Sequence, residues 1–434
     1  MKLFGTMNNN NGILEIGGIS VTDLAKQFKT PLYIMDQALI EKNIEKYKNG
    51  FKSDLFKTAI VYASKAFLSK GICQIVDKYG LDIDAVSGGE LYAIKSSNFP
   101  MDRVHMDGNN KSLEELEMCI DYGIDSIIID NIPEVINIQN IASKKDKKIN
   151  ALLRLNIGID AHTHEYIKTS KNNSKFGESI YDNKIYKTME TIINSKNINF
   201  LGFHCHIGSQ IFDMKSFYEA IDIMLDFSQK ISLKFGNIVK EINLGGGFGV
   251  YYTEKDVAVD LEEASKLIIK YLEKSLKEKS MELEKVSIEP GRSIVANAGS
   301  TLYTVGGTKE TYGGLKYIFV DGGMADNIRP ALYQAEYEAA IVNKMNEEPS
   351  EDVSIAGKCC ESGDIVVKNY KIAKAEIGDL VLTPTTGAYG HTMASNYNKC
   401  PIPAVVFVKD GKAKISIKRQ SYEDMIINDD FIEL

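Results

Sequence analysis

Short apolar segments alternate with amphipathic helical patterns from residue 31 to residue 290, and this alternation constrains the fold more than any other feature of the chain. Apolar residues such as Phe217, Ile221 and Leu225 recur at helical spacing between the segments. Eight segments are predicted as strands, at residues 57–62, 82–86, 103–106, 126–129, 151–155, 200–204, 241–244 and 286–289. Eight parallel strands joined by helices predict a (β/α)8 barrel, in which chemistry lies at the C-terminal strand ends.

The pattern changes near residue 300 to a period of two with few helices. Strands are predicted at residues 316–320, 379–382, 403–408 and 412–418, and Asp410-Gly411 is a hairpin signal between the last two. At the start of the chain, a strand pair at residues 13–19 precedes a helix that Ser20 caps, with Asp23 three residues on. A chain of 434 residues is also too long for one ordinary core. We therefore expect an N-terminal segment (1–30) that packs with the β domain, a barrel (31–290), and a C-terminal β domain (291–434) that is a β-barrel or β-sandwich.

Composition narrows the function classes. The formal net charge of -8 argues against nucleic acid or an anionic membrane surface as the main partner. No apolar run approaches the roughly 18 residues of a membrane span, and the first residues lack the apolar stretch of a signal peptide. Six cysteines without paired spacing suit reduced thiols. The expected location is the cytoplasm.

The first predicted strand ends at a lysine. Residues 58–63 are mostly apolar and β-branched, as in a buried parallel strand, and Lys65 follows after Ser64. An apolar setting disfavours the ammonium form, so such a lysine can attack a carbonyl. A lysine that simply reaches for solvent is the alternative.

Other reactive residue types follow the remaining strands. The second strand carries Asp84 and leads into Ser87-Gly88-Gly89-Glu90, and the fifth contains Arg154. The sixth leads into His204, His206 and Ser209, the seventh into a glycine loop at residues 245–249, and the eighth into Glu289, Pro290, Gly291 and Arg292. In a barrel all of these would lie at one mouth.

The glycine loop has two interpretations. Gly245, Gly246, Gly247 and Gly249 leave backbone N–H groups unshielded, which suits a phosphate, although a tight strand-to-helix turn would need the same residues. The loop is neither a dinucleotide fingerprint nor a Walker loop. Arg292 suits a phosphate or a carboxylate, or a structural ion pair.

A metal site is not expected. His204 and His206 alternate along a strand, so they point to opposite faces and make a poor metal pair. His162, His164 and Glu165 are better suspects by composition, but no third ligand is evident.

A lysine amine, a phosphate nest, a carboxylate and a flat imidazole at one barrel mouth match the needs of pyridoxal 5'-phosphate. In several motifs the chain also resembles the diaminopimelate decarboxylases, within the alanine-racemase-like (fold type III) enzymes that use this cofactor. The resemblance covers nearly the whole chain, and the matching stretches are residues 62–66, 87–90, 160–167, 174–177, 204–210, 245–249, 289–292 and 360–364.

The resemblance implies an activity and a role for each matching position. The activity is decarboxylation of meso-2,6-diaminopimelate to L-lysine and carbon dioxide, the last step of lysine biosynthesis. Lys65 would carry the cofactor covalently, His206 would stack on its ring, and Glu289 would pair with its ring nitrogen. The remaining cofactor-binding positions are Asp84, Arg154, Ser209, Gly245, Gly246, Gly247, Gly249, Pro290, Gly291, Arg292 and Tyr389.

The substrate, a small diamino acid, would contact Arg292, Arg329, Tyr333, Glu361 and Tyr389. Cys360 matches the proton donor, which in the family comes from the partner's β domain, so the resemblance also implies a homodimer with shared active sites. Ile157 departs from the family, which usually has proline there. Two alternatives are a sister decarboxylase of ornithine, lysine or arginine, and an inactive binding protein on the same fold. The sister enzymes usually have Cys-Asp where this chain has Cys360-Glu361.

Overall fold

The computed structural model describes residues 1–159 and 174–432. The chain forms two compact units. One consists of residues 1–42, 250–257 and 294–434, and the other of residues 43–249 and 258–293. No helix among the described residues is both long enough and apolar enough to span a bilayer.

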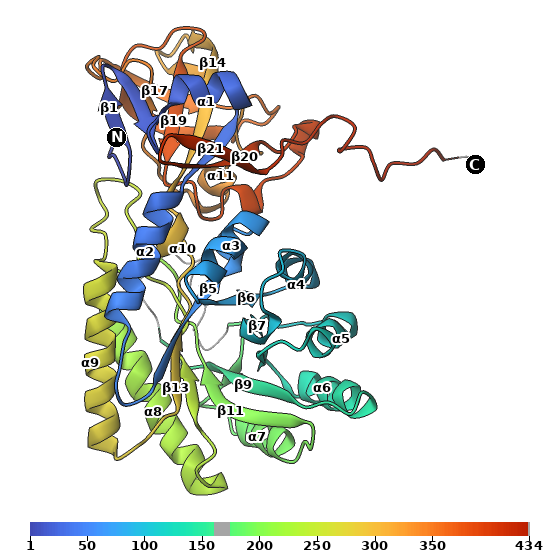
Figure 1. Cartoon of the computed structure of the whole chain (residues 1–434). Coiled ribbons are helices and arrows are strands. Elements are labelled where there is room, and N and C mark those ends of the chain that lie inside the picture. The colour runs from blue at the N-terminus through green and yellow to red at the C-terminus, as the bar shows by residue number, and fades with distance from the viewer. Residues whose placement is uncertain (160–173, 433–434) are drawn as a thin grey trace. The chain divides into compact units, whose positions relative to one another are not determined.

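The second unit is a closed parallel barrel (Figure 1). Each strand pairs with its neighbours in chain order, β8 pairs with β9, and β13 closes the ring onto β5. Eight strands of the described residues form it: β5 (Lys57–Ala63), β6 (Asp82–Ala85), β7 (Val104–Met106), β8 (Ser126–Ile129), β9 (Ile149–Asn156), β11 (Ile198–His204), β12 (Glu241–Asn243) and β13 (Lys285–Ile288). These strands confirm the predicted fold class and fall on the predicted segments, because parallel strands covered on both faces are apolar throughout.

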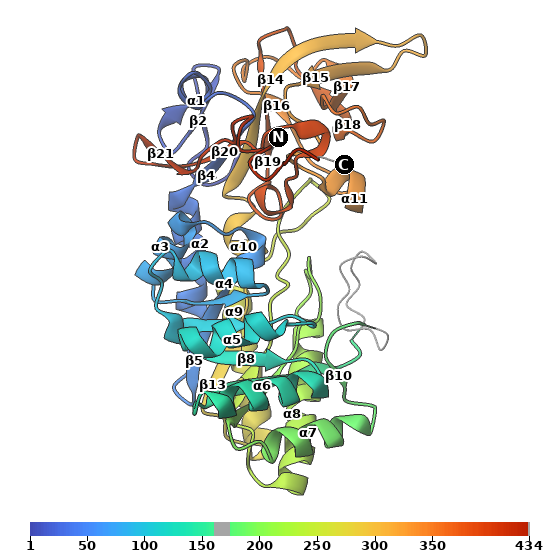
Figure 2. The same ribbon diagram turned by 90° about the vertical axis from the view of Figure 1, so that its right-hand side faces the viewer.

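Helices cover the outside of the barrel, as Figure 2 shows for α4 to α7. They are α3 (Lys70–Lys78), α4 (Gly88–Lys95), α5 (Leu113–Tyr122), α6 (Ile132–Lys144), α7 (Lys184–Ile193), α8 (Lys215–Phe235) and α9 (Leu261–Lys279). A short strand, β10 (Glu178–Ser179), pairs with the end of β9. Local chemistry sets the helix starts: Ser112 and Glu115 form a capping box at α5, and the Ser87 side chain accepts from the Glu90 N–H at α4.

The other unit is built on a mixed sheet, with β14 (Gly299–Glu310) at its centre. β14 pairs with β15 (Lys316–Val320), β19 (Leu380–Pro384) and β4 (Leu32–Asp36). The remaining strands are β16 (Ala340–Ile341), β17 (Glu351–Ala356), β18 (Ile365–Ile372), β20 (Ala404–Lys409) and β21 (Lys412–Ile417). Asp410 and Gly411 both have positive φ, as the predicted hairpin requires.

The N-terminal segment packs within this β unit. It contains β1 (Asn8–Asn10), β2 (Ile13–Ile16), β3 (Ile19–Ser20) and α1 (Val21–Phe28). Leu14, Ile16 and Leu24 are fully or almost fully buried, in one core cluster with Leu302 and Val406. The unit boundaries differ from the expected residues 31 and 291, because β4 pairs with β14 and β20 instead of entering the barrel. The divisions fall inside α2 (Gln37–Gly50) and α10 (Arg292–Val295).

Candidate active site

The predicted reactive side chains of the barrel lie at the C-terminal ends of its strands. Lys65 follows β5 in a single 3-10 turn (Ser64–Ala66), Asp84 lies in β6, and Arg154 lies in β9. His206 follows β11, and Glu289 follows β13. Because all these strands are parallel, the side chains share one mouth of the barrel.

Four carboxyl groups are close enough to feel the charge of the Lys65 amine. Asp84, Glu90, Asp107 and Glu289 each interact electrostatically with it. The backbone around it is fixed, since the Ser64 N–H donates to Asp84 Oδ1 at 2.8 Å and the Ala63 N–H donates to the Pro290 carbonyl at 3.2 Å. The strand is apolar, as expected, but carboxyl groups of other barrel elements act electrostatically on the amine that follows it.

Two of these carboxyl groups have raised pKa values. Burial, followed by the nearby charge of Glu289, raises the pKa of Asp84 well above its usual range. Burial also raises the pKa of Glu90, whose Oε2 accepts the Val86 N–H at 2.8 Å. Both groups therefore resist ionisation more strongly than exposed carboxyl groups, which limits the negative charge beside Lys65.

A buried ion pair joins β7 to β9. Arg154 Nη1 donates to the two carboxylate oxygens of Asp107 at 3.0 and 2.8 Å, and both side chains are 6% exposed. Burial alone would raise the pKa of Asp107, but the charge of Arg154 holds it far below its usual range. The Arg154 guanidinium also lies 4.5 Å from the ring centroid of Phe176. Arg154 is thus fixed by two contacts and ties residue 176 to the barrel mouth.

Glu289 is held by side chains of the two preceding strands. His204 Nε2 lies 3.1 Å from Glu289 Oε2, and Asn243 Nδ2 donates to Glu289 Oε1 at 2.8 Å. Burial alone would raise the pKa of Glu289, but His204 reverses the effect and lowers it. The site therefore contains a buried, ionised carboxylate, as the ring nitrogen of the cofactor requires.

His206 presents a neutral imidazole. Its Nδ1 accepts the Gly246 N–H at 3.2 Å, and burial, with the charges of Lys65 and Arg154, moves its pKa well below the usual value. A neutral, flat ring fixed through one edge is suited to stack on an aromatic cofactor.

The glycine loop forms a close-packed turn with available donors. Gly245 has φ +65°, and a Cβ there would lie 2.4 Å from the Cys205 carbonyl oxygen. A Cβ at Gly246 would lie 2.1 Å from the Glu289 carbonyl oxygen, and one at Gly247 would lie 2.5 Å from the Gly208 carbonyl oxygen. Nearby, the Ser209 hydroxyl accepts from Arg292 Nε at 3.1 Å and Nη2 at 2.9 Å.

The loop also leaves backbone donors for an anion. Among the described residues, the N–H groups of Gly247 and Phe248 donate to no protein group. Two free amides in a loop that excludes side chains, with Ser209 and Arg292 beside it, fit a phosphate. Together with Lys65, His206 and Glu289, these residues fit pyridoxal phosphate.

The remaining candidate residues lie in the β unit. Arg329 begins α11 (Arg329–Tyr333), is 6% exposed, and donates from Nη1 to the Tyr337 hydroxyl at 2.6 Å. Its guanidinium lies 4.9 Å from the Tyr252 ring centroid and 6.0 Å from that of Tyr333. Tyr389 is half-buried and has φ 58°. The Arg329 guanidinium therefore lies among the rings of three tyrosines, one of which is Tyr333.

Cys360 and Glu361 are exposed. The Cys360 N–H donates to Asn398 Oδ1 at 2.7 Å, and the preceding Cys359 N–H donates to Asp364 Oδ2 at 2.8 Å. The backbone of this turn is therefore fixed while the two side chains stay accessible.

No metal-binding cluster of histidine, cysteine or carboxylate side chains occurs in residues 1–159 and 174–432. His162, His164 and Glu165, the best suspects by composition, lie outside the described residues.

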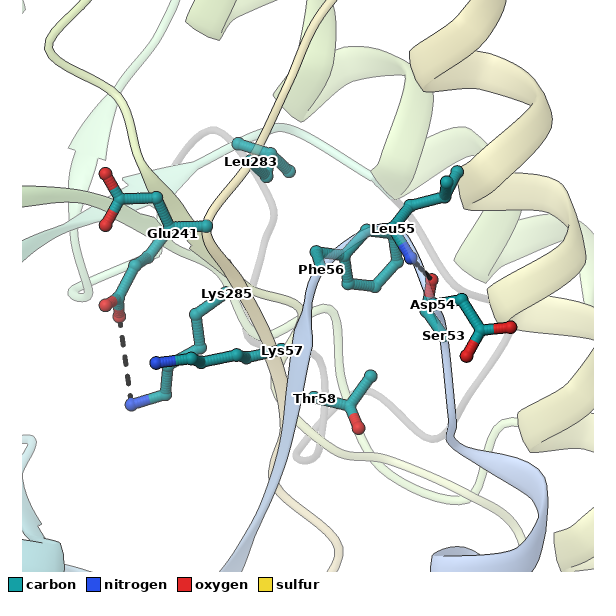
Figure 3. Close-up of a pocket in the computed structure, with 10 residues that line it drawn as sticks. Ser53, Asp54, Leu55, Phe56, Lys57, Thr58, Glu241, Leu283 and Lys285 are labelled. Atoms are coloured by element: carbon teal, nitrogen blue, oxygen red, sulfur yellow. Dashed lines mark hydrogen bonds and ion pairs between the residues drawn. The ribbon is translucent and has the colours of Figure 1, made fainter.

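An open pocket of about 710 Å³ is lined by the residues drawn in Figure 3. It lies at the N-terminal ends of the barrel strands, whereas Lys65 follows the C-terminal end of β5. Its lining includes Lys57, Glu241 and Lys285, the first residues of β5, β12 and β13, and Lys285 Nζ lies 3.8 Å from Glu241 Oε2. Since barrel chemistry belongs to the C-terminal strand ends, this pocket is separate from the site around Lys65.

Comparison with known proteins identifies the family. The family described as "Pyridoxal-dependent decarboxylase, pyridoxal binding domain" matches residues 37–296. Diaminopimelate decarboxylase of Bacillus subtilis (strain 168) is 44% identical over 427 residues, which cover 98% of this chain and 97% of that protein. The chain belongs to the diaminopimelate decarboxylase family. The protein of that name from Staphylococcus aureus (strain COL) is 41% identical over 422 residues, covering 97% of this chain and 98% of its own.

Solved structures support the same family assignment. Diaminopimelate decarboxylase from M. jannaschii, in complex with L-lysine, superposes with a TM-score of 0.92 at 33% identity, covering 98% of each chain. The lysine/ornithine decarboxylase of Vibrio vulnificus, complexed with putrescine, has a TM-score of 0.75 over 90% of this chain and 97% of its own, but at 22% identity it shows the shared fold alone. These comparisons confirm the family and the pyridoxal phosphate cofactor expected from the sequence, and they favour diaminopimelate decarboxylase over the sister enzymes.

Sequence reasoning missed Asp107 and Asn243 as members of the site. Asp107 directly follows β7, so the rule that found the other strand ends could have found it. Asn243 lies two residues before the glycine loop, and no pattern in the sequence marks it. Its role depends on its contacts with Glu289 and with the Gly245 N–H, which only the folded chain shows.

Proposed function

We propose that the protein decarboxylates meso-2,6-diaminopimelate to L-lysine and carbon dioxide with pyridoxal phosphate, the last step of lysine biosynthesis. The observation that carries the proposal is the cluster of Lys65, His206 and Glu289 beside the glycine loop. This cluster lies in a chain whose relatives of up to 44% identity are named diaminopimelate decarboxylase. The L-lysine in the M. jannaschii complex is the product that this reaction would release.

Each residue of the barrel has a separate task. Lys65 would hold the cofactor covalently through its amine. Ser209, Arg292 and the backbone amides of Gly247 and Phe248 would hold the phosphate, while His206 would pack its neutral face on the ring. When bound, the cofactor supplies an electron sink for the electron pair left by the departing carbon dioxide. Glu289, as an ionised carboxylate, keeps the ring nitrogen protonated and thereby deepens that sink.

Residues of the β unit, together with Arg292 of the barrel unit, select the substrate in this proposal. Arg329 and Arg292 suit carboxylates, Glu361 suits the distal ammonium group, and Tyr333 and Tyr389 complete the set. Cys360 returns a proton to the carbon that has lost its carboxylate. The barrel unit, residues 43–249 and 258–293, would act as the cofactor domain, and the other unit would supply most of the substrate-binding residues.

The test of this function is a panel of amino acids given to the purified protein with pyridoxal phosphate, with carbon dioxide release as the readout. We expect meso-diaminopimelate to be turned over and to exceed ornithine and lysine in kcat/KM by on the order of 10⁴, since a site built for a distal charged group is left with unpaired polar groups when an analogue lacks it. Comparable turnover of ornithine and diaminopimelate would contradict the proposal.

We further infer a cytoplasmic homodimer in which each subunit lends Cys360 to the Lys65 of its partner. In a two-fold dimer the exchange is reciprocal, so a Lys65→Ala chain and a Cys360→Ala chain rebuild one intact site when they pair. Random subunit exchange makes half the dimers mixed, and roughly a quarter of the wild-type activity should return. No recovery despite demonstrated exchange would show that Cys360 does not act across subunits.

A further inference from the structure

His204 has a contact that the proposed reaction does not yet use. It is the last residue of β11 and is fully buried, and its Nε2 lies 3.1 Å from Glu289 Oε2. Its neighbour in the sheet register is Asn243 of β12, which holds the other oxygen of the same carboxylate at 2.8 Å. Three adjacent barrel elements therefore meet on one carboxylate.

The hydrogen bonds fix which nitrogen of His204 carries a proton. Nδ1 is buried and has no partner among the described residues, whereas Nε2 faces a carboxylate. A proton on Nδ1 would be a buried donor without an acceptor, which is costly. His204 thus donates from Nε2 to Glu289.

This donor matters because the surroundings oppose a charge on Glu289. The group is 6% exposed, and Asp84 and Asp107 are nearby carboxyl groups. Arg154 is already paired with Asp107. The Lys65 amine also favours the ionised form of Glu289, but in the proposed function it is taken up by the cofactor. Asn243 supplies a neutral donor on one oxygen, so His204 is needed for the other oxygen if the buried carboxylate is to stay ionised.

We propose that His204 is a positioning residue that keeps Glu289 ionised and oriented, and so keeps the ring nitrogen of the bound cofactor protonated. This inference rests on the proposed function, which assigns the ring nitrogen to Glu289. With one donor on each carboxylate oxygen, a lone pair remains to accept from the pyridinium N–H. Without His204, Glu289 takes up a proton, the ring nitrogen loses its own, and the electron sink weakens.

The experiment compares three variants reconstituted with pyridoxal phosphate that carries ¹⁵N at the ring nitrogen. His204→Phe keeps a flat ring without the donor, His204→Gln keeps a donor at a similar distance, and Glu289→Gln is the reference for a site without the negative charge. ¹⁵N NMR reports the protonation of the ring nitrogen directly, and kcat, KM, cofactor content and thermal midpoint are measured on the same samples.

We expect the Phe variant to shift the ring-nitrogen signal toward that of Glu289→Gln and to lose on the order of 10- to 100-fold in kcat, the range for a hydrogen bond to a charged group, with KM changed only a few-fold. The Gln variant should retain the protonated signal and most of kcat. If the Phe variant does not fold, His204→Leu, which is smaller and also lacks the donor, replaces it.

Three results would overturn the inference. A protonated ring nitrogen in a folded Phe or Leu variant would assign His204 to packing alone, as would equal damage from Gln and Phe. If Glu289→Gln itself leaves the nitrogen protonated, the assignment of Glu289 fails and the inference fails with it. In the first case the role of Glu289 in the proposed function still stands.

Discussion

Replacing Asp107 by alanine should strongly destabilise the barrel. Asp107 and Arg154 share two hydrogen bonds of 3.0 and 2.8 Å, and each side chain is 6% exposed. Removing one partner of such a pair leaves an uncompensated charge in a site with little access to water, which costs about 3–5 kcal/mol. That is a large share of the 5–15 kcal/mol by which typical domains are stable, so part of the variant should be unfolded at 37 °C.

The assay is urea unfolding followed by circular dichroism, at matched protein and cofactor concentrations. The control is Glu262→Ala, which removes an exposed i,i+4 pair with Lys266 in the same unit and should cost less than about 0.5 kcal/mol. If Asp107→Ala costs no more than Glu262→Ala, the buried pair does not support the barrel as described.

The same pair makes a prediction about pH. The native pKa of Asp107 is far below its unfolded value of about 3.9, so the stabilisation is complete above that value and is lost as the pH falls toward the native pKa. The stability difference between wild type and Asp107→Asn should therefore stay constant from pH 5 to 8 and shrink below about pH 4. A difference that grows on acidification would contradict the sign of the shift.

Two further predictions concern a glycine of the loop and a capping side chain of a helix. Gly245→Ala should lose affinity for pyridoxal phosphate by at least about tenfold, because positive φ and a Cβ at 2.4 Å from the Cys205 carbonyl together strain the loop. Gly80→Ala, with φ +69° and open space around it, should leave the affinity unchanged, and equal losses in an absorbance titration would refute the close-approach argument. Ser112→Ala should cost about 1 kcal/mol in thermal unfolding by removing the capping box of α5, whereas Asn183→Ala, at a cap position without such a bond, should cost almost nothing.

The barrel could be predicted because its signals are local. A buried parallel strand is an apolar run in the sequence, and the residue types that follow it mark the mouth, which is how Lys65, Arg154 and Glu289 were placed. β4 (Leu32–Asp36) shows the limit of this approach. It looks like the first strand of the alternation, but its partners are β14 and β20, far along the chain, and no local pattern records such a pairing.

The electrostatics of the site could not be predicted in the same way. The sequence suggested an apolar setting for Lys65, whereas acidic groups in β6 and directly after β7 and β13 act electrostatically on its amine. His204 was expected at the barrel mouth, but the only role weighed for it was that of a metal ligand, because nothing near it in the chain reveals Glu289, 85 positions away, as its partner. Such electrostatic properties depend on which strands become neighbours in the closed barrel, and the local sequence does not record those pairings.

The central claim is that Lys65, at the end of β5, carries pyridoxal phosphate. Borohydride converts the lysine–cofactor bond into a stable adduct, and proteolysis with mass spectrometry locates it on the chain. We expect the purified protein to be yellow, to lose that colour on reduction, and to carry the adduct on Lys65, with none in a Lys65→Ala variant. An adduct on any other lysine would contradict the assignment of the barrel mouth as the active site.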